Sequence, residues 1–125
     1  MNKASKQEIL NQLQLYTGTE GYYRYLGGLL LTDGAKFVAE ACGAYWLLDI
    51  ICSVQTIPEV KNEDLQVCHL RKTGETTAIF TIEDGDNNLV YQQEIPFTDF
   101  PLDQMTLWVC AQDQQKRIVM LPSEY

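Results

Sequence analysis

A long apolar stretch, Ala35–Gln55, constrains the fold more than any other part of the chain. Apolar residues with the three- and four-residue spacing of one helical face lie at Phe37, Ala41, Ala44, Leu48 and Ile51. Further apolar side chains widen this face, so the sequence predicts a long and mostly buried helix on which the other elements pack. Charges at Lys36, Glu40 and Asp49 interrupt the stretch, and no basic flank accompanies it. The pattern therefore favours a core helix over a membrane span.

The ends of this helix carry recognisable signals. Thr32 or Asp33 can accept a hydrogen bond from the free amides of the first turn, so either residue can cap the helix. Pro58 cannot continue the helical hydrogen bonds and predicts the end. Gly43 lies in the middle, where glycine costs about 1 kcal/mol relative to alanine. We expect either a break into two helices or a point of close packing there.

Length and charge limit the classes of protein that fit. The 125 residues, 46% of them hydrophobic, predict a single domain over residues 1–125 with its own core. The formal charge of -8 argues against direct binding of nucleic acid, because phosphate contacts need a basic surface. No secretory signal begins the sequence, and the four cysteines are far apart: Cys42, Cys52, Cys68 and Cys110. We therefore expect free thiols in a reducing cytoplasm.

The remaining elements can be placed by their spacing. Ser5 and Glu8 have the capping-box spacing before an amphipathic helix at Lys6–Tyr16, and a short strand is expected at Leu26–Leu31. A polar connection, Glu59–Asp64, then leads into extended segments separated by turns. These strands are predicted at Leu65–Arg71, Thr77–Glu83, Leu89–Ile95, Met105–Ala111 and Arg117–Leu121.

This order of elements predicts an α+β fold. An N-terminal helix, a short strand and a long central helix precede a four- to five-stranded antiparallel meander, which the central helix would cover. The order is similar to that of cystatin-like and nuclear-transport-factor-like folds, and the analogy concerns architecture alone.

Asp49 is the residue with the most chemical interest. If it were buried on the central helix, desolvation would raise its pKa and make it a candidate general acid or base. Its neighbours Tyr45 and Trp46, together with Trp108 on a strand, would then line a small-molecule pocket. The structural alternative is that Asp49 lies at a less buried edge or is paired with Arg24 or a tyrosine hydroxyl.

No metal or cofactor site is expected. His69 is the only histidine, and its neighbour Cys68 would point to the opposite face of a strand. The cysteines lack the paired spacing of zinc sites, and the loop after Glu83 lacks the ligand positions of a calcium loop. Gly27-Gly28 lacks the further glycine and the lysine of a phosphate-binding loop.

Two aromatic segments are candidate binding surfaces. Tyr22 and Tyr23 adjoin Arg24, and Asp99 lies in a second segment, between two phenylalanines. Tyrosine and arginine are favoured in interface hot spots, although such residues can also seal the end of a sheet. Trp108 alternates with the apolar residues of its strand, so it either packs under a second layer or is exposed.

Several motifs together indicate a family resemblance. They are Thr17–Glu20 (TGTE), Tyr22–Arg24 (YYR), Thr32–Gly34 (TDG), Gly43–Asp49 (GAYWLLD), Glu94–Pro101 (EIPFTDFP) and the terminal LPSEY. The set resembles a family of small uncharacterised proteins of bacteria, plasmids and phages, classed as a domain of unknown function. The resemblance implies a shared fold and no established activity. Its mobile-element setting implies an accessory or defence-related interaction protein.

Three functions remain open. The first is a protein-interaction module, acting through a partner or self-association, whose acidic surface occupies a basic site on a nucleic-acid enzyme. The second is a small-molecule binder with a pocket near Asp49. The third is an enzyme that uses Asp49 as a general acid or base, which is ranked last and would require a water-accessible pocket and a raised pKa.

Overall fold

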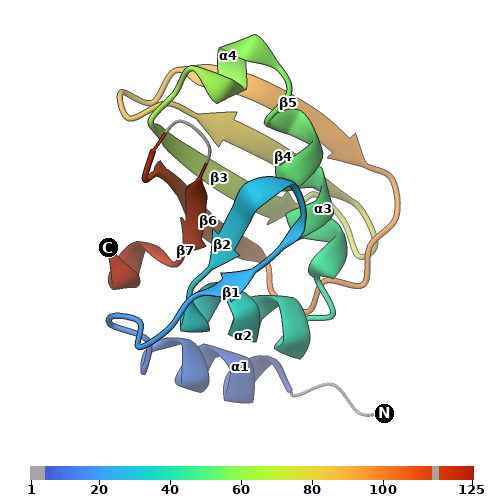
Figure 1. Ribbon diagram of the computed structural model, residues 1–125. Helices are drawn as coiled ribbons and strands as arrows, with labels where there is room; N and C mark the ends of the chain where they lie inside the picture. The colour runs from blue at the N-terminus through green and yellow to red at the C-terminus, as the bar shows by residue number, and fades with distance from the viewer. Residues whose placement is uncertain (1–4, 114–115) are drawn as a thin grey trace.

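One mixed sheet organises the structure. The computed structural model describes residues 5–113 and 116–125. In these residues the helices are α1 (Lys6–Leu13), α2 (Asp33–Ala41), α3 (Tyr45–Val54) and α4 (Pro58–Lys61). The strands are β1 (Tyr23–Arg24), β2 (Leu29–Leu31), β3 (Leu65–Lys72), β4 (Ala78–Glu83), β5 (Leu89–Ile95), β6 (Gln104–Ala111) and β7 (Arg117–Met120). Two single 3-10 turns, η1 (Leu26–Gly28) and η2 (Pro122–Glu124), complete the described elements (Figure 1).

The sheet has the strand order β1-β2-β7-β6-β3-β4-β5. All neighbouring strands are antiparallel except β2 and β7, which run parallel with Leu30 opposite Ile118. The predicted α+β class is confirmed, whereas the prediction of four to five strands is wrong because seven strands form. The two-residue strand β1 was missed, since two residues give no periodicity to detect.

The predicted meander holds for β3, β4 and β5 and for the pair β6 and β7, but it is wrong between β5 and β6. Strand β6 pairs with β3 instead of β5, with Cys68 opposite Leu107. The connection of residues 96–103 makes this possible, because its buried Phe100 and Leu102 attach it to the core. At its end the carbonyl of Asp103 accepts a hydrogen bond from the amide of Lys72, which places the start of β6 beside the end of β3.

The predicted single central helix is also wrong, because the chain divides it into α2 and α3. Gly43 adopts the left-handed conformation, with φ 60°, between the two helices. The amide of Ala44 donates to the carbonyl of Ala39 at 2.8 Å, a bond typical of a helix that closes on a glycine. Of the two expectations for Gly43, the break is therefore confirmed.

The predicted helix caps are confirmed, whereas the predicted helix ends are wrong. The Thr32 hydroxyl accepts from the amide of Ala35, and the Ser5 hydroxyl accepts from the amide of Glu8, so both helices begin where expected. Helix α1 ends at Leu13, before the predicted Tyr16. Pro58 does not end the central helix but begins α4, in which its fixed φ suits the first helical position.

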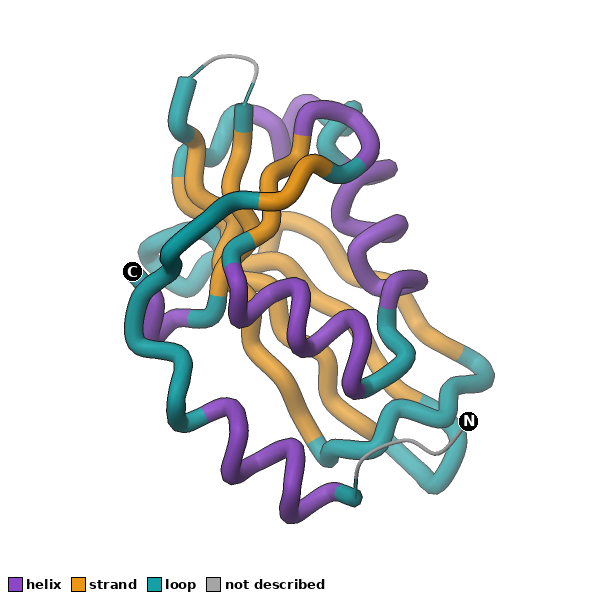
Figure 2. The backbone as a smooth tube through the Cα atoms, turned by 60° about the horizontal axis from the view of Figure 1, so that its bottom comes forward, coloured by secondary structure: helices purple, strands orange, loops and turns teal. Residues whose placement is uncertain are grey.

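Helices α2 and α3 cover one face of the sheet, as Figure 2 shows. The core between them contains Val38, Leu48 and Ile51 from the helices and Leu70 and Phe80 from the strands, all at most 2% exposed. No described helix is long and apolar enough to cross a membrane.

Candidate interaction surface

Asp49 lies on the exposed side of α3 and is paired with a tyrosine. The hydroxyl of Tyr25 donates to its Oδ1 at 2.5 Å. The ring of Tyr25 also stacks on that of Tyr45, with 6.0 Å between centroids. Partial burial and the bond to Asp49 raise the pKa of Tyr25 to about 12. Asp49 is exposed and not buried as the general acid or base hypothesis required, and the alternative of a less buried edge with a tyrosine partner describes the structure.

A second cluster surrounds Tyr23. The ammonium of Lys36 lies 4.1 Å from the centre of the Tyr23 ring and 4.0 Å from a carboxylate oxygen of Glu40. A hydrogen bond between Tyr23 and Asp33 raises the pKa of the Tyr23 hydroxyl. The pKa of Asp33 is lowered, chiefly because its carboxylate accepts from the amide of Glu20 at 3.0 Å.

The two clusters adjoin on one side of β1. Tyr23 on β1 and Tyr25, the extended residue just after β1, are two residues apart, and their side chains contact Lys36 of α2 and Asp49 of α3. The pKa of Tyr23 is raised chiefly by its hydrogen bond to Asp33 and that of Tyr45 chiefly by burial, and the charge of Glu40 adds a smaller contribution to both. We call this the tyrosine–acid surface, made of Tyr23, Tyr25, Asp33, Lys36, Glu40, Tyr45 and Asp49. Next to it, a hollow of about 380 Å³ is lined by Tyr16, Tyr23, Asp33, Lys36, Phe37 and Glu40.

The charge of the tyrosine–acid surface is negative. It has carboxylates at Asp33, Glu40 and Asp49 and one cation at Lys36, so its formal charge is 1 − 3 = −2. Lys36 is itself bound by an aromatic face and a carboxylate, the two groups that recognise a cation. The surface therefore presents aromatic rings beside carboxylates and has a net negative charge.

The structure does not bring Trp108 to the other residues of the predicted pocket. Trp46 is half-buried and packs against the core next to Tyr45. Leu107 and Val109 face that core, so Trp108 lies on the other face of the sheet, where its ring meets the edge of Tyr125 at 5.3 Å. Trp108 is half-buried, between the two expectations of full cover and full exposure, and Tyr125 provides the cover.

The other predicted binding residues lie on exposed positions. Tyr22, 55% exposed, and Arg24 flank Tyr23, and Arg24 pairs with Leu30 in the sheet. Asp99 is exposed in the connection between β5 and β6.

A match to a protein family covers almost the whole described fold. The model of a family of unknown function, DUF6876, matches residues 7–125. The chain belongs to this family. No curated protein and no solved structure matches the chain. The family match therefore assigns no function to this DUF6876 protein.

Sequence reasoning missed a buried carboxylate in this DUF6876 protein. Glu124 is 9% exposed and accepts from the hydroxyl of Thr32 at 2.6 Å, the amide of Gly34 at 3.0 Å and the amide of Leu121 at 2.9 Å. The carboxylate therefore lies at the N-terminus of α2, where the helix dipole favours a negative charge. The segments TDG and LPSEY are far apart in the sequence, so no local pattern predicted this contact. Their joint appearance in the family resemblance was the only indication of it.

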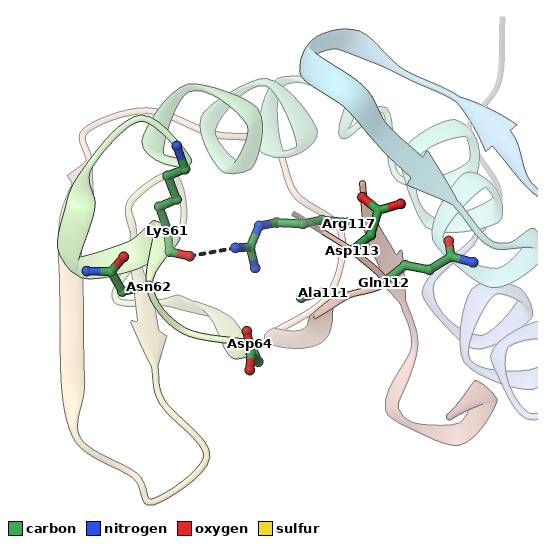
Figure 3. Close-up of a pocket in the computed structure, with 7 residues that line it drawn as sticks. All are labelled: Lys61, Asn62, Asp64, Ala111, Gln112, Asp113 and Arg117. Atoms are coloured by element: carbon green, nitrogen blue, oxygen red, sulfur yellow. Dashed lines mark hydrogen bonds between the residues drawn. The ribbon is translucent and has the colours of Figure 1, made fainter. Parts of the chain in front are cut away.

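The hollow in Figure 3, of about 670 Å³, has a structural explanation. It is lined by Lys61, Asn62, Asp64, Ala111, Gln112, Asp113 and Arg117. The guanidinium of Arg117 donates to the carbonyls of Lys61 and Glu63 and so satisfies acceptors at the end of α4. Two cations and two carboxylates balance each other in the lining, which selects no charged ligand.

His69 lies between Thr106 and Glu83 on the face of the sheet that the helices do not cover. Its Nδ1 lies 3.0 Å from the hydroxyl of Thr106, and its Nε2 lies 3.5 Å from a carboxylate oxygen of Glu83. Cys68 points into the core, as strand alternation predicted, so the two neighbours are separated by the sheet. In the described part of the chain, no three residues of the metal-binding types come together.

Proposed function

We propose that this DUF6876 protein is a small interaction module that binds a basic segment of a protein partner through the tyrosine–acid surface. The observation that carries the proposal is the binding of Lys36 between the Tyr23 ring and Glu40. A lysine or arginine of a partner would find the same groups at Tyr45 and Asp49. Guanidinium groups stack well on tyrosine and pair well with carboxylates.

The exposure of the aromatic groups supports the same proposal. Tyr23 and Tyr45 are each 40% exposed, Tyr22 is 55% exposed and Leu26, which follows Tyr25, is 64% exposed. Tyrosine provides large contact area with little loss of side-chain entropy, which is why it is frequent in binding surfaces. The bond to Asp49 and the stack on Tyr45 hold Tyr25 in place before any partner arrives.

The resemblance to plasmid and phage proteins provides a setting for the proposal. We propose that the module acts in the cytoplasm and occupies a basic site on a nucleic-acid enzyme. The chain charge of -8 supports this function, because a negative surface steers and binds a positive one.

The test compares two charge reversals with equal effect on the net charge. Glu40→Lys changes the tyrosine–acid surface, whereas Glu59→Lys changes an exposed position of α4. The probe is a fluorescent octa-arginine peptide, followed by anisotropy, with an octa-glutamate peptide as the negative control. We expect Glu40→Lys to weaken binding at least about tenfold and Glu59→Lys to change it by less than about twofold.

Equal losses in the two variants would mean that net charge alone attracts the peptide, which contradicts the proposal. Capture of a protein from nuclease-treated lysate of the native host then identifies the partner, provided that Glu40→Lys abolishes the capture and Glu59→Lys does not. Asp49→Asn tests the enzymatic alternative. That variant would lose turnover and keep peptide binding if Asp49 were an acid or base.

A further inference from the structure

A separate hollow shares two cations with the hollow in Figure 3 but has different walls. It lies where the turn η1 meets the C-terminal end of α3, beside α4 and the first residue of β7. Figure 1 shows the connection between β1 and β2, which contains η1, beside α3. The volume is about 490 Å³, within the range that small organic ligands occupy. Its main lining residues are Gly27, Gly28, Ser53, Thr56, Lys61 and Arg117, and we call it the glycine-turn hollow.

The charge of the glycine-turn hollow is opposite to that of the protein. The chain has 17 acidic and nine basic side chains, yet the lining contains Lys61 and Arg117 and no carboxylate. In the described part of the chain, neither cation forms an ion pair with a carboxylate. Two like charges at one hollow repel each other, and an anion between them would remove that repulsion.

The two cations are held together by the backbone. The guanidinium of Arg117 donates to the carbonyls of Lys61 and Glu63. These bonds use two of its five N–H groups, so the others can donate to a ligand. The ammonium of Lys61 points away from Asp64 in Figure 3, and it keeps its three donors.

Two hydroxyls of the lining act as acceptors. The Ser53 hydroxyl donates to the carbonyl of Ile50 at 2.9 Å, and the Thr56 hydroxyl donates to the carbonyl of Ser53 at 2.9 Å. Because a hydroxyl has only one hydrogen, both groups offer lone pairs to a ligand. The same bonds satisfy carbonyls near the end of α3, which would otherwise repel an anion.

The turn η1 brings bare backbone to the hollow. Gly27 and Gly28 have φ of 66° and 81°, a conformation that residues with a Cβ rarely adopt. A Cβ on Gly27 would also lie 2.6 Å from the Sγ of Cys52. The turn therefore packs on α3 and leaves room beside it for a ligand.

We propose that the glycine-turn hollow binds the phosphate monoester of a sugar. Such a phosphate carries a charge of about −1.5 to −2 at pH 7, which matches two cations better than the single charge of a carboxylate does. Lys61 and Arg117 donate to the phosphate oxygens, and sugar hydroxyls donate to Ser53 and Thr56. The segment Gly27-Gly28 has no lysine of its own, and α4 supplies Lys61 instead.

This site is separate from the tyrosine–acid surface. The two have no residue in common, and their charges are opposite. A basic peptide and a sugar phosphate therefore test different proposals, and either proposal can fail without the other.

The test measures binding of ribose 5-phosphate and glucose 6-phosphate by isothermal titration calorimetry. Ribose and inorganic phosphate are the ligand controls. Lys61→Gln removes one cation of the hollow, and Lys116→Gln makes the same change of charge next to Arg117 but outside the lining. Both lysines are exposed, so we expect both variants to fold, and circular dichroism verifies this. The double substitution Ser53→Ala and Thr56→Val removes the two hydroxyl acceptors.

We expect at least one sugar phosphate to bind at least about tenfold more tightly than inorganic phosphate, and ribose not to bind. Lys61→Gln should weaken that binding at least about tenfold and Lys116→Gln less than about twofold. The double variant should weaken sugar phosphate binding at least about threefold and leave inorganic phosphate unchanged.

Three results would overturn the proposal. The first is that neither sugar phosphate binds, and the second is that the two lysine variants lose binding equally. The third is that inorganic phosphate binds as tightly as the sugar phosphates, which would show that the hydroxyls select no sugar. Octa-arginine binding should stay within about twofold in Lys61→Gln, because Lys61 lies outside the tyrosine–acid surface.

Discussion

The carboxylate of Glu124 occupies the space that a side chain on Gly34 would need. A Cβ built on Gly34 would lie closer to Oε1 of Glu124 than real Cβ atoms come to any neighbour. The absence of that atom lets the carboxylate reach the amide of Gly34 and the hydroxyl of Thr32 at the start of α2. The C-terminal turn is thereby attached to the helix by charge-assisted hydrogen bonds.

Substitution of Gly34 should therefore destabilise the fold. In Gly34→Ala the new methyl group displaces the Glu124 carboxylate from its donors, at a cost of at least about 1–3 kcal/mol. Chemical denaturation followed by circular dichroism measures this change. Gly18→Ala is the matched control, because a Cβ at Gly18 meets nothing within 4 Å. Equal stability of the two variants would show that Glu124 does not constrain α2.

The break between α2 and α3 makes a prediction about Gly43. Because its φ of 60° is unfavourable for residues with a Cβ, Gly43→Ala should destabilise the protein by about 1–2 kcal/mol. The better helix former should not join α2 and α3, because both helices are held by the core. An increase of helical circular dichroism, with unchanged or higher stability, would contradict this account of the break.

Alkaline pH should weaken the Tyr25–Asp49 contact. The pKa of Tyr25 rises from 10.0 to about 12 in the folded protein. The unfolded chain loses the phenolic proton near pH 10, so the stabilisation is complete below that pH and is lost as the pH rises toward 12. We expect the unfolding free energy of wild type to fall over this range more than that of Tyr25→Phe. Tyr22→Phe, at an exposed position, should behave like wild type.

The four cysteines should differ in reactivity. No disulfide joins them, and Cys42 and Cys68 are buried whereas Cys52 and Cys110 are half-buried. Burial raises the pKa of the Cys68 and Cys110 thiols, and alkylation requires the thiolate. Mass spectrometry after iodoacetamide treatment should show Cys42 and Cys68 labelled only after denaturation. Equal labelling of all four in the native protein would contradict the packing of β3.

Local chemistry predicted much of the secondary structure. Alternation and turn residues placed β5 at its observed bounds, and capping preferences placed the starts of α1 and α2 at Ser5 and Thr32. They also suggested a break at Gly43. Pro58 was read as a helix end, although the same fixed φ that ends a helix also suits its first residue.

The candidate site was predicted only in parts. The sequence combined Tyr45 with Asp49 on one helix and singled out Tyr23 separately, but it gave no reason to join Tyr23 to them and no reason to add Lys36 or Glu40. These residues come together only because β1 and the residue after it lie against α2 and α3. No sequence pattern links a strand to two helices in this way. Trp108 was assigned to the same pocket because strand alternation alone does not say which face of a sheet a helix covers.

The sequence by itself determined which segments are helical or extended, because caps, turns and periodicity act between neighbours in the chain. Only the tertiary structure decided that β6 lies beside β3, that β2 runs parallel to β7 and that Glu124 reaches Gly34. These relations join residues far apart in the sequence, and they depend on how the whole core packs. No local pattern records them, because many pairings would satisfy the same strands and only one of them also buries the apolar faces of α2 and α3.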